Sequence, residues 1–259
     1  MQILVCIDDT DNIESRGTGE LAEMIRRSME EKGWGKTQHV TRHQLLLHPD
    51  IPYTSHNSSM CFQAEIEAAL LPHVISYAEA FLARECQQEA DPGLCVLAVD
   101  GLTEQAKRTV INFGYKAKKT VLTKAEAYDL ANQLEIHLSE HGGTGQGVIG
   151  ALAGAGLRLS NNDGWFKGDH KVGRQGEAMT VQRLLSFSAI DQVKSVNGAC
   201  LPENDYVVIG NKLKTVLLEG KAVILVYPED LGNGDFIWKT CEKKQLREYE
   251  AKMNCVADK

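Results

Sequence analysis

The stretch QILVCIDDTD, residues 2–11, decides how the fold of this chain begins. Its first six residues, QILVCI, are rich in aliphatic side chains, which predicts a short buried β-strand. Three aspartates, Asp8, Asp9 and Asp11, follow directly behind that strand. Carboxylates this close repel one another, so the arrangement requires a group that stabilises it.

Two kinds of group remain open for these carboxylates. A hard divalent cation such as Mg²⁺ prefers oxygen ligands of this kind, together with substrate phosphates. An Asp-rich turn can instead use its side chains to cap backbone amides. In an extended segment Asp9 and Asp11, two residues apart, would point to one side, which suits a metal ion.

The segment RGTG, residues 16–19, favours the metal-binding alternative. Gly17 and Gly19 flank Thr18 at the start of an apolar helical pattern that ends at Gly33. Glycines at such a position expose backbone amides, and the helix dipole favours an anion there. Acidic ligands and a phosphate-binding helix start within one loop suit a nucleotide polyphosphate. Thr18 also suits the N-cap position of that helix.

The order of elements predicts the fold class. Buried strands alternate with helical patterns in the order β-α-β-β-α-β, with the strands at 2–7, 39–48, 58–68 and 94–100 and the second helix at 72–88. This order predicts an α/β (α+β) protein with ferredoxin-like βαββαβ units in a mixed sheet.

The rest of the chain divides into further regions. A helix is expected over 103–114 and a strand over 118–123, and Thr123 with Glu126 forms a capping box that opens a long helix toward His141. We expect an α/β body over 1–175, which carries the acidic and glycine-rich loops. A small β-rich domain, OB-like or a small barrel, is expected over 176–235 and a helical tail over 236–259.

Composition and charge exclude several classes of protein. No apolar run approaches the roughly 20 residues that span a bilayer, and the N-terminus lacks the pattern of a signal peptide. Seven cysteines without a CxxC pair predict neither a zinc ribbon nor a disulfide framework. The net charge of −7 argues against a protein that mainly grips nucleic acid. The expectation is a cytoplasmic protein without membrane contact.

Two further sets of residues are candidates for ligand contact. The segment GGTGQG, residues 142–147, is not a Walker A motif, and it lets the backbone approach a phosphate or ribose closely. The small residues that follow in VIGALAGAG could instead simply permit close helix packing. Among the clustered histidines, His39 and His43 share no clean strand face, so a zinc site is not favoured. His56 and Asn57, in a proline-flanked loop, are better placed to contact a ligand.

Several of these motifs, in this order, resemble the archaeal tRNA-Ile agmatinylcytidine synthetase family. The resemblance covers roughly residues 1–157 and rests on IDDTD, the helix start at Thr18, LHPDIPYTS at 47–55, the DPG turn before LCVLAVD, and GGTGQGVIGALAGAG at 142–156. The family uses ATP with Mg²⁺ to activate the C2 carbonyl of a tRNA wobble cytidine for attack by agmatine, in a domain described as a kinase.

The resemblance implies roles for particular residues here. It implies a catalytic and metal site at Asp8, Asp9 and Asp11, with Thr18 at the position of a phosphorylated threonine. Nucleotide-binding positions would be Gly17, Thr18, Gly19, Gly142, Gly143, Thr144, Gly145 and Gly147. A substrate loop would contain Pro52, Tyr53, His56 and Asn57. ATP and Mg²⁺ are the implied cofactors, and a nucleotide and tRNA the implied partners.

The chain also departs from the family pattern. Gly19 replaces a second threonine, no cysteine precedes Thr18, and the residues after the IP-aromatic motif are not basic. No cysteine quartet for the family's zinc ribbon is present, so we expect a shortened homologue. We therefore expect an ATP/Mg-dependent phosphoryl-transfer or ligase-type enzyme that acts on an RNA base or a small carbonyl-containing acceptor. A non-catalytic nucleotide- or metabolite-binding module and an RNA-binding protein are the alternatives.

Overall fold

The computed structural model describes residues 1–10, 17–51, 57–87, 89–168, 172–232 and 234–256. The chain divides into two compact units, Met1–Lys167 (unit 1) and Gly168–Lys259 (unit 2). The expected division between body and β-rich region, at 175/176, lies a few residues beyond this one. Within the described residues, every helix is too short or too polar to cross a lipid bilayer.

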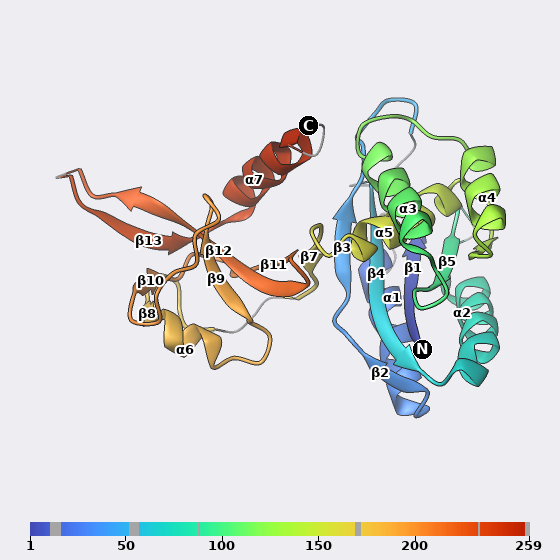
Figure 1. Cartoon of the computed structure of the whole chain (residues 1–259), viewed down its shortest axis with the longest axis horizontal. Helices are drawn as coiled ribbons and strands as arrows, with labels where there is room; N and C mark the ends of the chain where they lie inside the picture. The colour runs from blue at the N-terminus through green and yellow to red at the C-terminus, as the bar shows by residue number, and fades with distance from the viewer. Residues whose placement is uncertain (11–16, 52–56, 88, 169–171, 233, 257–259) are drawn as a thin grey trace. The chain divides into compact units, whose positions relative to one another are not determined.

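Unit 1 begins with the expected ferredoxin-like order (Figure 1). Its strands are β1 (Gln2–Asp8), β2 (Gly35–Thr37), β3 (Thr41–Gln44), β4 (Ser58–Ile66), β5 (Gly93–Ala98), β6 (His137–Glu140) and β7 (Trp165–Phe166). Its helices are α1 (Thr18–Glu31), the 3₁₀ turn Ala68–Leu70, α2 (Leu71–Glu85), α3 (Glu104–Lys116), α4 (Lys124–Gln133) and α5 (Gly147–Leu159). The central strands lie in the order β5-β1-β4-β3, and each of these pairings is antiparallel.

The alternation of β1 assigns its side chains to two layers. Ile3, Val5 and Ile7 pack in one core with residues of α1 and α2, and Leu4 and Cys6 pack in the other with residues of α3, α4 and α5. Because successive strand residues point to opposite faces, Asp8 belongs to the α5 face of the sheet. The carboxylate that ends β1 is thereby directed toward α5.

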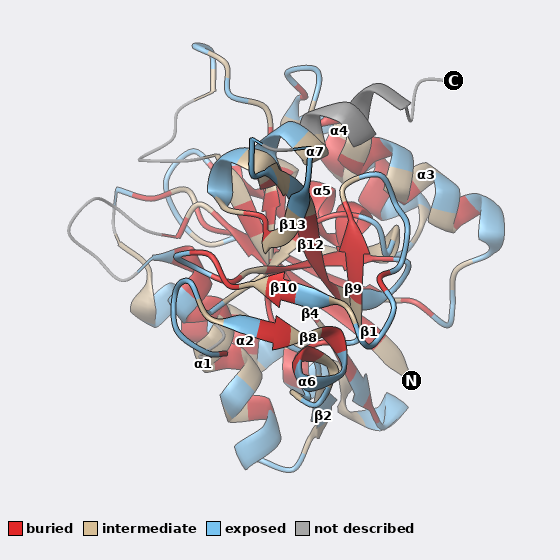
Figure 2. Ribbon diagram, turned by 90° about the vertical axis from the view of Figure 1, so that its left-hand side faces the viewer, coloured by how far each residue is buried: buried red, intermediate tan, exposed pale blue. Residues whose placement is uncertain are grey.

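Helix α5 is buried along almost its whole length (Figure 2), because it packs between the sheet and α3. Its small residues permit this approach. A Cβ on Gly154 would overlap Ser59 Oγ and would lie 2.7 Å from Cys6 Sγ. On the other side, a Cβ on Gly156 would overlap the Val110 carbonyl of α3. The sequence alternative of close helix packing is therefore confirmed for this part of the glycine-rich stretch.

Two sequence expectations between α3 and α5 are wrong. Residues 118–123, expected as a strand, form a turn and an extended loop. The long helix opened by the Thr123–Glu126 capping box, itself confirmed, ends at Gln133 instead of continuing toward His141. Glu135 takes a φ of 53°, and Ile136 N donates to Ala131 O at 2.9 Å, which is the Schellman geometry that terminates helices. Strand β6 then follows.

Unit 2 is rich in short strands, and residues 236–240, expected as part of a helical tail, form a strand. It contains β8 (Ala178–Thr180), α6 (Val181–Leu185), β9 (Gln192–Ser195), β10 (Tyr206–Val208), β11 (Thr215–Leu218), β12 (Lys221–Asp230), β13 (Phe236–Thr240) and α7 (Lys243–Val256). Strand β12 pairs antiparallel with β11 and β13 and parallel with β9, so the mixed character of the sheet lies here. The unit has its own core, which includes Val193, Val207 and Ile224.

Candidate nucleotide site

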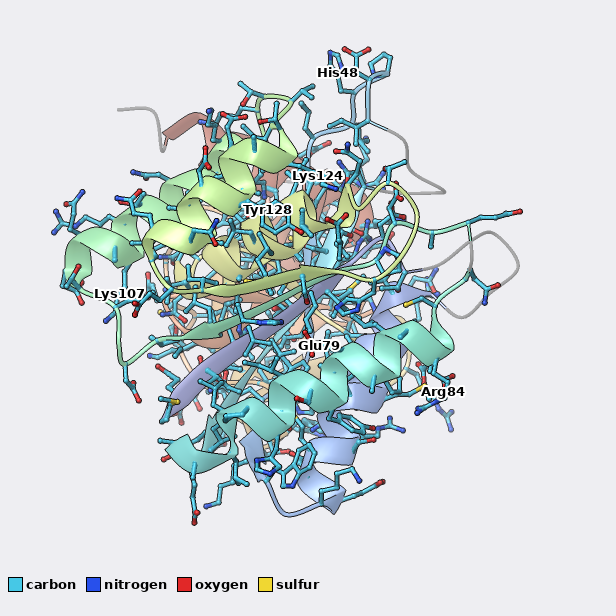
Figure 3. All side chains as sticks on the ribbon, turned by 90° about the vertical axis from the view of Figure 1, so that its right-hand side faces the viewer. His48, Glu79, Arg84, Lys107, Lys124 and Tyr128 are labelled. Atoms are coloured by element: carbon cyan, nitrogen blue, oxygen red, sulfur yellow. The ribbon has the colours of Figure 1, made fainter. Side chains whose placement is uncertain are left out.

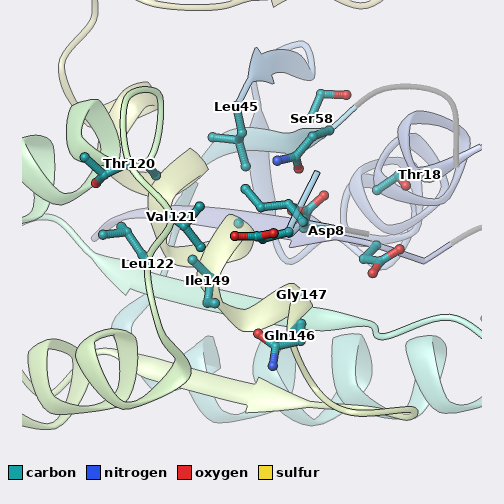
Figure 4. Close-up of a pocket in the computed structure, with 16 residues that line it drawn as sticks. Asp8, Thr18, Leu45, Ser58, Thr120, Val121, Leu122, Gln146, Gly147 and Ile149 are labelled. Carbon is teal, nitrogen blue, oxygen red and sulfur yellow. The ribbon is translucent and has the colours of Figure 1, made fainter. Parts of the chain in front are cut away.

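A cavity of about 310 Å³ lies at the carboxyl end of β1 in unit 1. Its volume is at the small end of the roughly 300–1,000 Å³ that is usual for ligand sites. Figure 4 shows Asp8 in this cavity, with Thr18 on one side and Val121 and Leu122 on the other. The lining residues come from four regions of the chain that are far apart in sequence: 8–18, 45–58, 117–122 and 146–150.

The two described aspartates form the acidic part of the cavity. Asp8 is the last residue of β1 and is 7% exposed. Asp9 has a φ of 50°, a left-handed conformation that is uncommon for residues other than glycine. This conformation turns the chain away from the sheet directly after the strand, so that Asp8 and Asp9 both line the cavity. Asp11 lies outside the described residues.

The start of α1 contributes Thr18. The expectation that Thr18 is the N-cap is wrong: Gly17 is the N-cap, without a side-chain hydrogen bond, and Thr18 is the first helical residue. Thr18 is buried and lines the cavity. Gly19 lies against the Lys167 side chain, because a Cβ there would be 3.0 Å from Lys167 Cε.

The start of α5 forms the opposite side of the acidic part. Gln146, Gly147, Ile149 and Gly150 line the cavity. A Cβ on Gly150 would overlap Asp8 Oδ2, so the carboxylate of Asp8 packs directly on the helix backbone. The positive end of the helix dipole stabilises a carboxylate at this place. The glycine-rich stretch and the acidic loop, which the sequence leaves about 130 positions apart, therefore meet at one site.

The loop before α5 is placed differently from its first helical turn. Gly142, Gly143, Thr144 and Gly145 are not among the residues that line the cavity. The amides of Thr144 and Gly145 donate hydrogen bonds to the carboxylate of Asp91. Of the five candidate positions in this stretch, the structure brings only Gly147 to the cavity.

The expected substrate loop is described only at its end. Pro52, Tyr53 and His56 lie outside the described residues. Asn57 lines the cavity, and its side-chain amide donates to Leu46 O at 2.7 Å.

The apolar wall of the cavity contains residues that sequence reasoning missed. Leu45, Val121, Leu122 and Ile149 supply it, and scattered aliphatic residues carry no signal in the sequence that would identify them as site residues. A wall of this kind beside two carboxylates suits a ligand with one charged and one apolar part.

A buried polar network includes residues adjacent in sequence to those that line the cavity. His43 Nδ1 lies 2.9 Å from Asp163 Oδ1, and Lys118, next to the wall residue Ala117, forms an ion pair with the same carboxylate. Burial lowers the pKa of His43, against the effect of Asp163. Burial alone would raise the pKa of Asp163, but the hydrogen bond from His43 and the charge of Lys118 lower it.

The protonation states in this network follow from these shifts. Burial disfavours the charged form of His43, and the partners of Asp163 favour its carboxylate. The Thr41 hydroxyl, 2.8 Å from Nε2, completes the network, in which His43 has a structural role.

The number of carboxylates at the acidic end of the cavity fits a magnesium ion. Mg²⁺ is commonly held by one or two carboxylates together with substrate phosphates, and Asp8 and Asp9 supply two carboxylates at one cavity. Among the described residues, no group of three or more His, Cys, Asp or Glu side chains is arranged to hold a metal ion. The described residues therefore suit a metal ion that arrives with a phosphate ligand.

Comparison with known proteins gives a consistent result. No protein-family model matches the chain. The isoleucine-tRNA 2-agmatinylcytidine synthetase TiaS of Methanosarcina acetivorans is 28% identical over 245 residues, which cover 88% of this chain and 56% of the relative. TiaS of Methanosarcina mazei matches with the same identity and coverage. The chain is therefore similar to TiaS proteins over most of its length.

Solved TiaS structures share the fold. Apo TiaS aligns with a TM-score of 0.50 and 26% identity over 60% of this chain and 35% of that chain. A complex of TiaS with its isoleucine tRNA and ATP aligns with a TM-score of 0.52 over 79% of this chain and 50% of that chain, at 22% identity. This chain spans 56% of the length of the curated TiaS relatives that it matches.

Proposed function

We propose that this protein is an ATP- and Mg²⁺-dependent enzyme of phosphoryl-transfer or ligase type, related to TiaS. The observation that carries the proposal is the cavity in which Asp8, Asp9, Thr18 and the first turn of α5 meet. Phosphoryl transfer requires positioning and neutralisation of charge more than covalent chemistry by the protein. Two carboxylates for a metal ion and two helix N-termini beside them are the parts that this chemistry uses.

In this proposal the residues of the candidate site have defined roles. Asp8 and Asp9, with Asp11, hold a magnesium ion, which neutralises phosphate charge when it is bound. Gly17, Thr18 and Gly19 place the start of α1 against the phosphates, and Gly147 does the same for α5. The apolar wall around Leu122 and Ile149 packs on an uncharged part of the nucleotide or acceptor.

The acceptor is proposed as an RNA base or a small carbonyl-containing molecule. The support for RNA is that the relatives are named as synthetases of 2-agmatinylcytidine in an isoleucine tRNA and that a protein of this fold was solved with that tRNA and ATP. A tRNA is therefore the first macromolecular partner to examine.

Calorimetric titration with ATP and Mg²⁺ tests the nucleotide part of the proposal. Wild-type protein should bind, and Asp9→Ala should abolish binding. Asp129→Ala, which removes an exposed carboxylate on α4, is the matched control and should bind as wild type. Absence of binding by the wild type would remove the proposal.

ATP turnover tests the catalytic part. Consumption of ATP should depend on a tRNA or an amine in a panel of acceptors. Nucleotide binding without turnover by any acceptor would favour a non-catalytic nucleotide-binding module. Salt-dependent tRNA affinity that survives Asp9→Ala, without ATP binding, would favour an RNA-binding protein.

A further inference from the structure

The glycine-rich loop before α5 holds a carboxylate of the chain itself. The backbone amides of Thr144 and Gly145 both donate to Asp91 Oδ1, the second at 3.2 Å. The Thr144 hydroxyl donates to Asp91 Oδ2 at 2.7 Å. Successive amides that converge on one oxygen form an anion-binding nest. In this protein the anion in the nest is Asp91.

The loop is fixed around that carboxylate from two sides. Gly143 has a φ of 54° and would overlap Asp91 Oδ1 if it carried a Cβ. The backbone oxygen of Asp91 accepts a hydrogen bond from Gly147 N at 3.1 Å. Lys124 Nζ, of α4, donates to Thr144 O at 2.8 Å and to Glu140 Oε2 at 2.7 Å. Lys124 is labelled in Figure 3. Asp91 therefore contacts both the loop and the first residue of α5.

Asp91 is also tied to the strand that faces the acidic site. It lies two residues before Gly93, the first residue of β5, and Gly93 is paired with Asp8 of β1. Gly93 lies in backbone contact with Gly147, since a Cβ on Gly93 would overlap the Gly147 carbonyl and one on Gly147 would lie 2.8 Å from Gly93 N. The short segment 91–93 thus contacts both Asp8 of β1 and the start of α5.

We propose that Asp91 is a positioning residue for the nucleotide site. Its side chain holds the loop so that the first turn of α5, with Gly147, Ile149 and Gly150, stands against Asp8 and forms one side of the cavity. Loss of the carboxylate removes the acceptor of three donors, and the loop then no longer fixes where α5 begins. The effect on nucleotide affinity rests on the proposed function, whereas the effect on the position of α5 does not.

Hydrogen exchange of the ligand-free protein tests the positional claim. In Asp91→Ala, amides of 144–151 should exchange at least about tenfold faster, the factor that corresponds to loss of one charge-assisted hydrogen bond, and Asp91→Asn should be intermediate. Asp100→Ala is the matched control. Asp100 also accepts a backbone amide, Gln2 N at 2.8 Å, but at the opposite end of β1, so exchange over 144–151 should not change.

Two results would overturn the claim about position. Faster exchange confined to Thr144 and Gly145, with unchanged rates over 148–151, would show that Asp91 only satisfies the loop. Unchanged exchange throughout would show that the nest holds without it. If Asp91→Ala does not fold, Thr144→Val, which removes only the hydroxyl donor, serves in its place. It should accelerate exchange over 148–151 by a smaller factor. Unchanged exchange over 148–151 in Thr144→Val would overturn the claim.

Titration with ATP and Mg²⁺ tests the consequence for the site. The dissociation constant should rise by at least about tenfold in Asp91→Ala, less in Asp91→Asn, and not in Asp100→Ala. Unchanged affinity in Asp91→Ala would overturn the role in binding even if exchange changes. If the wild-type protein does not bind the nucleotide, the proposed function fails, while the exchange experiment still decides whether Asp91 positions α5.

Discussion

Gly150→Ala tests whether α5 packs on Asp8 as closely as the structure shows. A Cβ at position 150 would overlap Asp8 Oδ2 and would lie 2.7 Å from Asp8 Cγ and 3.1 Å from Leu45 Cδ1. Since non-bonded heavy atoms pack at about 3.5–4.0 Å, the overlapping Asp8 Oδ2 must move by roughly 1.5–2 Å. Asp8 is buried, so it has little space in which to do so.

The expected free energy follows from three contributions. Alanine in place of glycine favours a helix by about 1 kcal/mol. Forcing the Asp8 side chain away from its rotamer costs about 0.5–1.5 kcal/mol. Disturbing the polar contacts of a buried carboxylate costs about 1–3 kcal/mol more. The net expectation is that Gly150→Ala lowers the free energy of unfolding of unit 1 by about 0.5–3.5 kcal/mol.

Urea unfolding measures this quantity for unit 1 when it is monitored by the hydrogen exchange of β1 amides. Gly154→Ala is the matched control, because it lies one turn further along α5 and overlaps Ser59 instead of Asp8. Both variants should lose stability, but only Gly150→Ala should lose affinity for ATP and Mg²⁺. A Gly150→Ala protein as stable as the wild type or more stable would mean that only helix propensity changes, and the close contact of α5 with Asp8 would be refuted.

Two further predictions concern the buried network beside the apolar wall. Lys118→Met removes the cation that pairs with buried Asp163 and should lower the free energy of unfolding by about 3–5 kcal/mol. Lys119→Met in the same turn serves as control in urea titrations, and equal losses would contradict the role of Lys118. Burial lowers the pKa of His43 below its usual 6.5, so the unfolded chain takes up this proton at higher pH than the folded protein. Stability should therefore be complete above about pH 6.5 and fall as pH decreases toward the folded pKa, by at most about 1.4 kcal/mol per pH unit for one proton. His43→Gln should show a shallower pH slope in unfolding experiments, and an identical slope would assign the titration to other groups.

Local patterns in the sequence predict those parts of the fold whose cause is local. The strand before Asp8 and the capping box at Thr123 and Glu126 depend on residues within a few positions of one another, and both are confirmed. The β-α-β-β-α-β order follows from such segments. This element order in turn implies the sheet order β5-β1-β4-β3 of a ferredoxin-like unit, which the structure has.

The errors have causes that are distant in sequence or rare in type. Residues 118–123 resemble a strand, but Lys118 is buried against Asp163, 45 positions away, and this turn delivers Val121 and Leu122 to the cavity. The helix expected to reach His141 ends because Glu135 takes a left-handed conformation, which residues other than glycine seldom adopt. Neither event has a signature in a short window of sequence.

The candidate site likewise contains parts that the sequence predicts and parts that it does not. The acidic residues Asp8 and Asp9 are conspicuous in the sequence, since closely spaced carboxylates suggest a cation. The glycine-rich stretch is conspicuous too, but its pattern does not reveal which anion its amides bind. That anion is Asp91, 53 positions from Thr144, and the pairing of β5 with β6, which sets Gly93 opposite Glu140, brings it there.

The glycines of the stretch 142–156 therefore serve one arrangement by separate means. Gly143 and Gly145 have positive φ values of 54° and 73° and shape the nest for Asp91. Gly147 and Gly150 let the helix start approach the backbone of β5 and the carboxylate of Asp8. Gly154 and Gly156 let the same helix pack between the sheet and α3. The packing of the core and the wall of the acidic site therefore depend on different glycines of one helix.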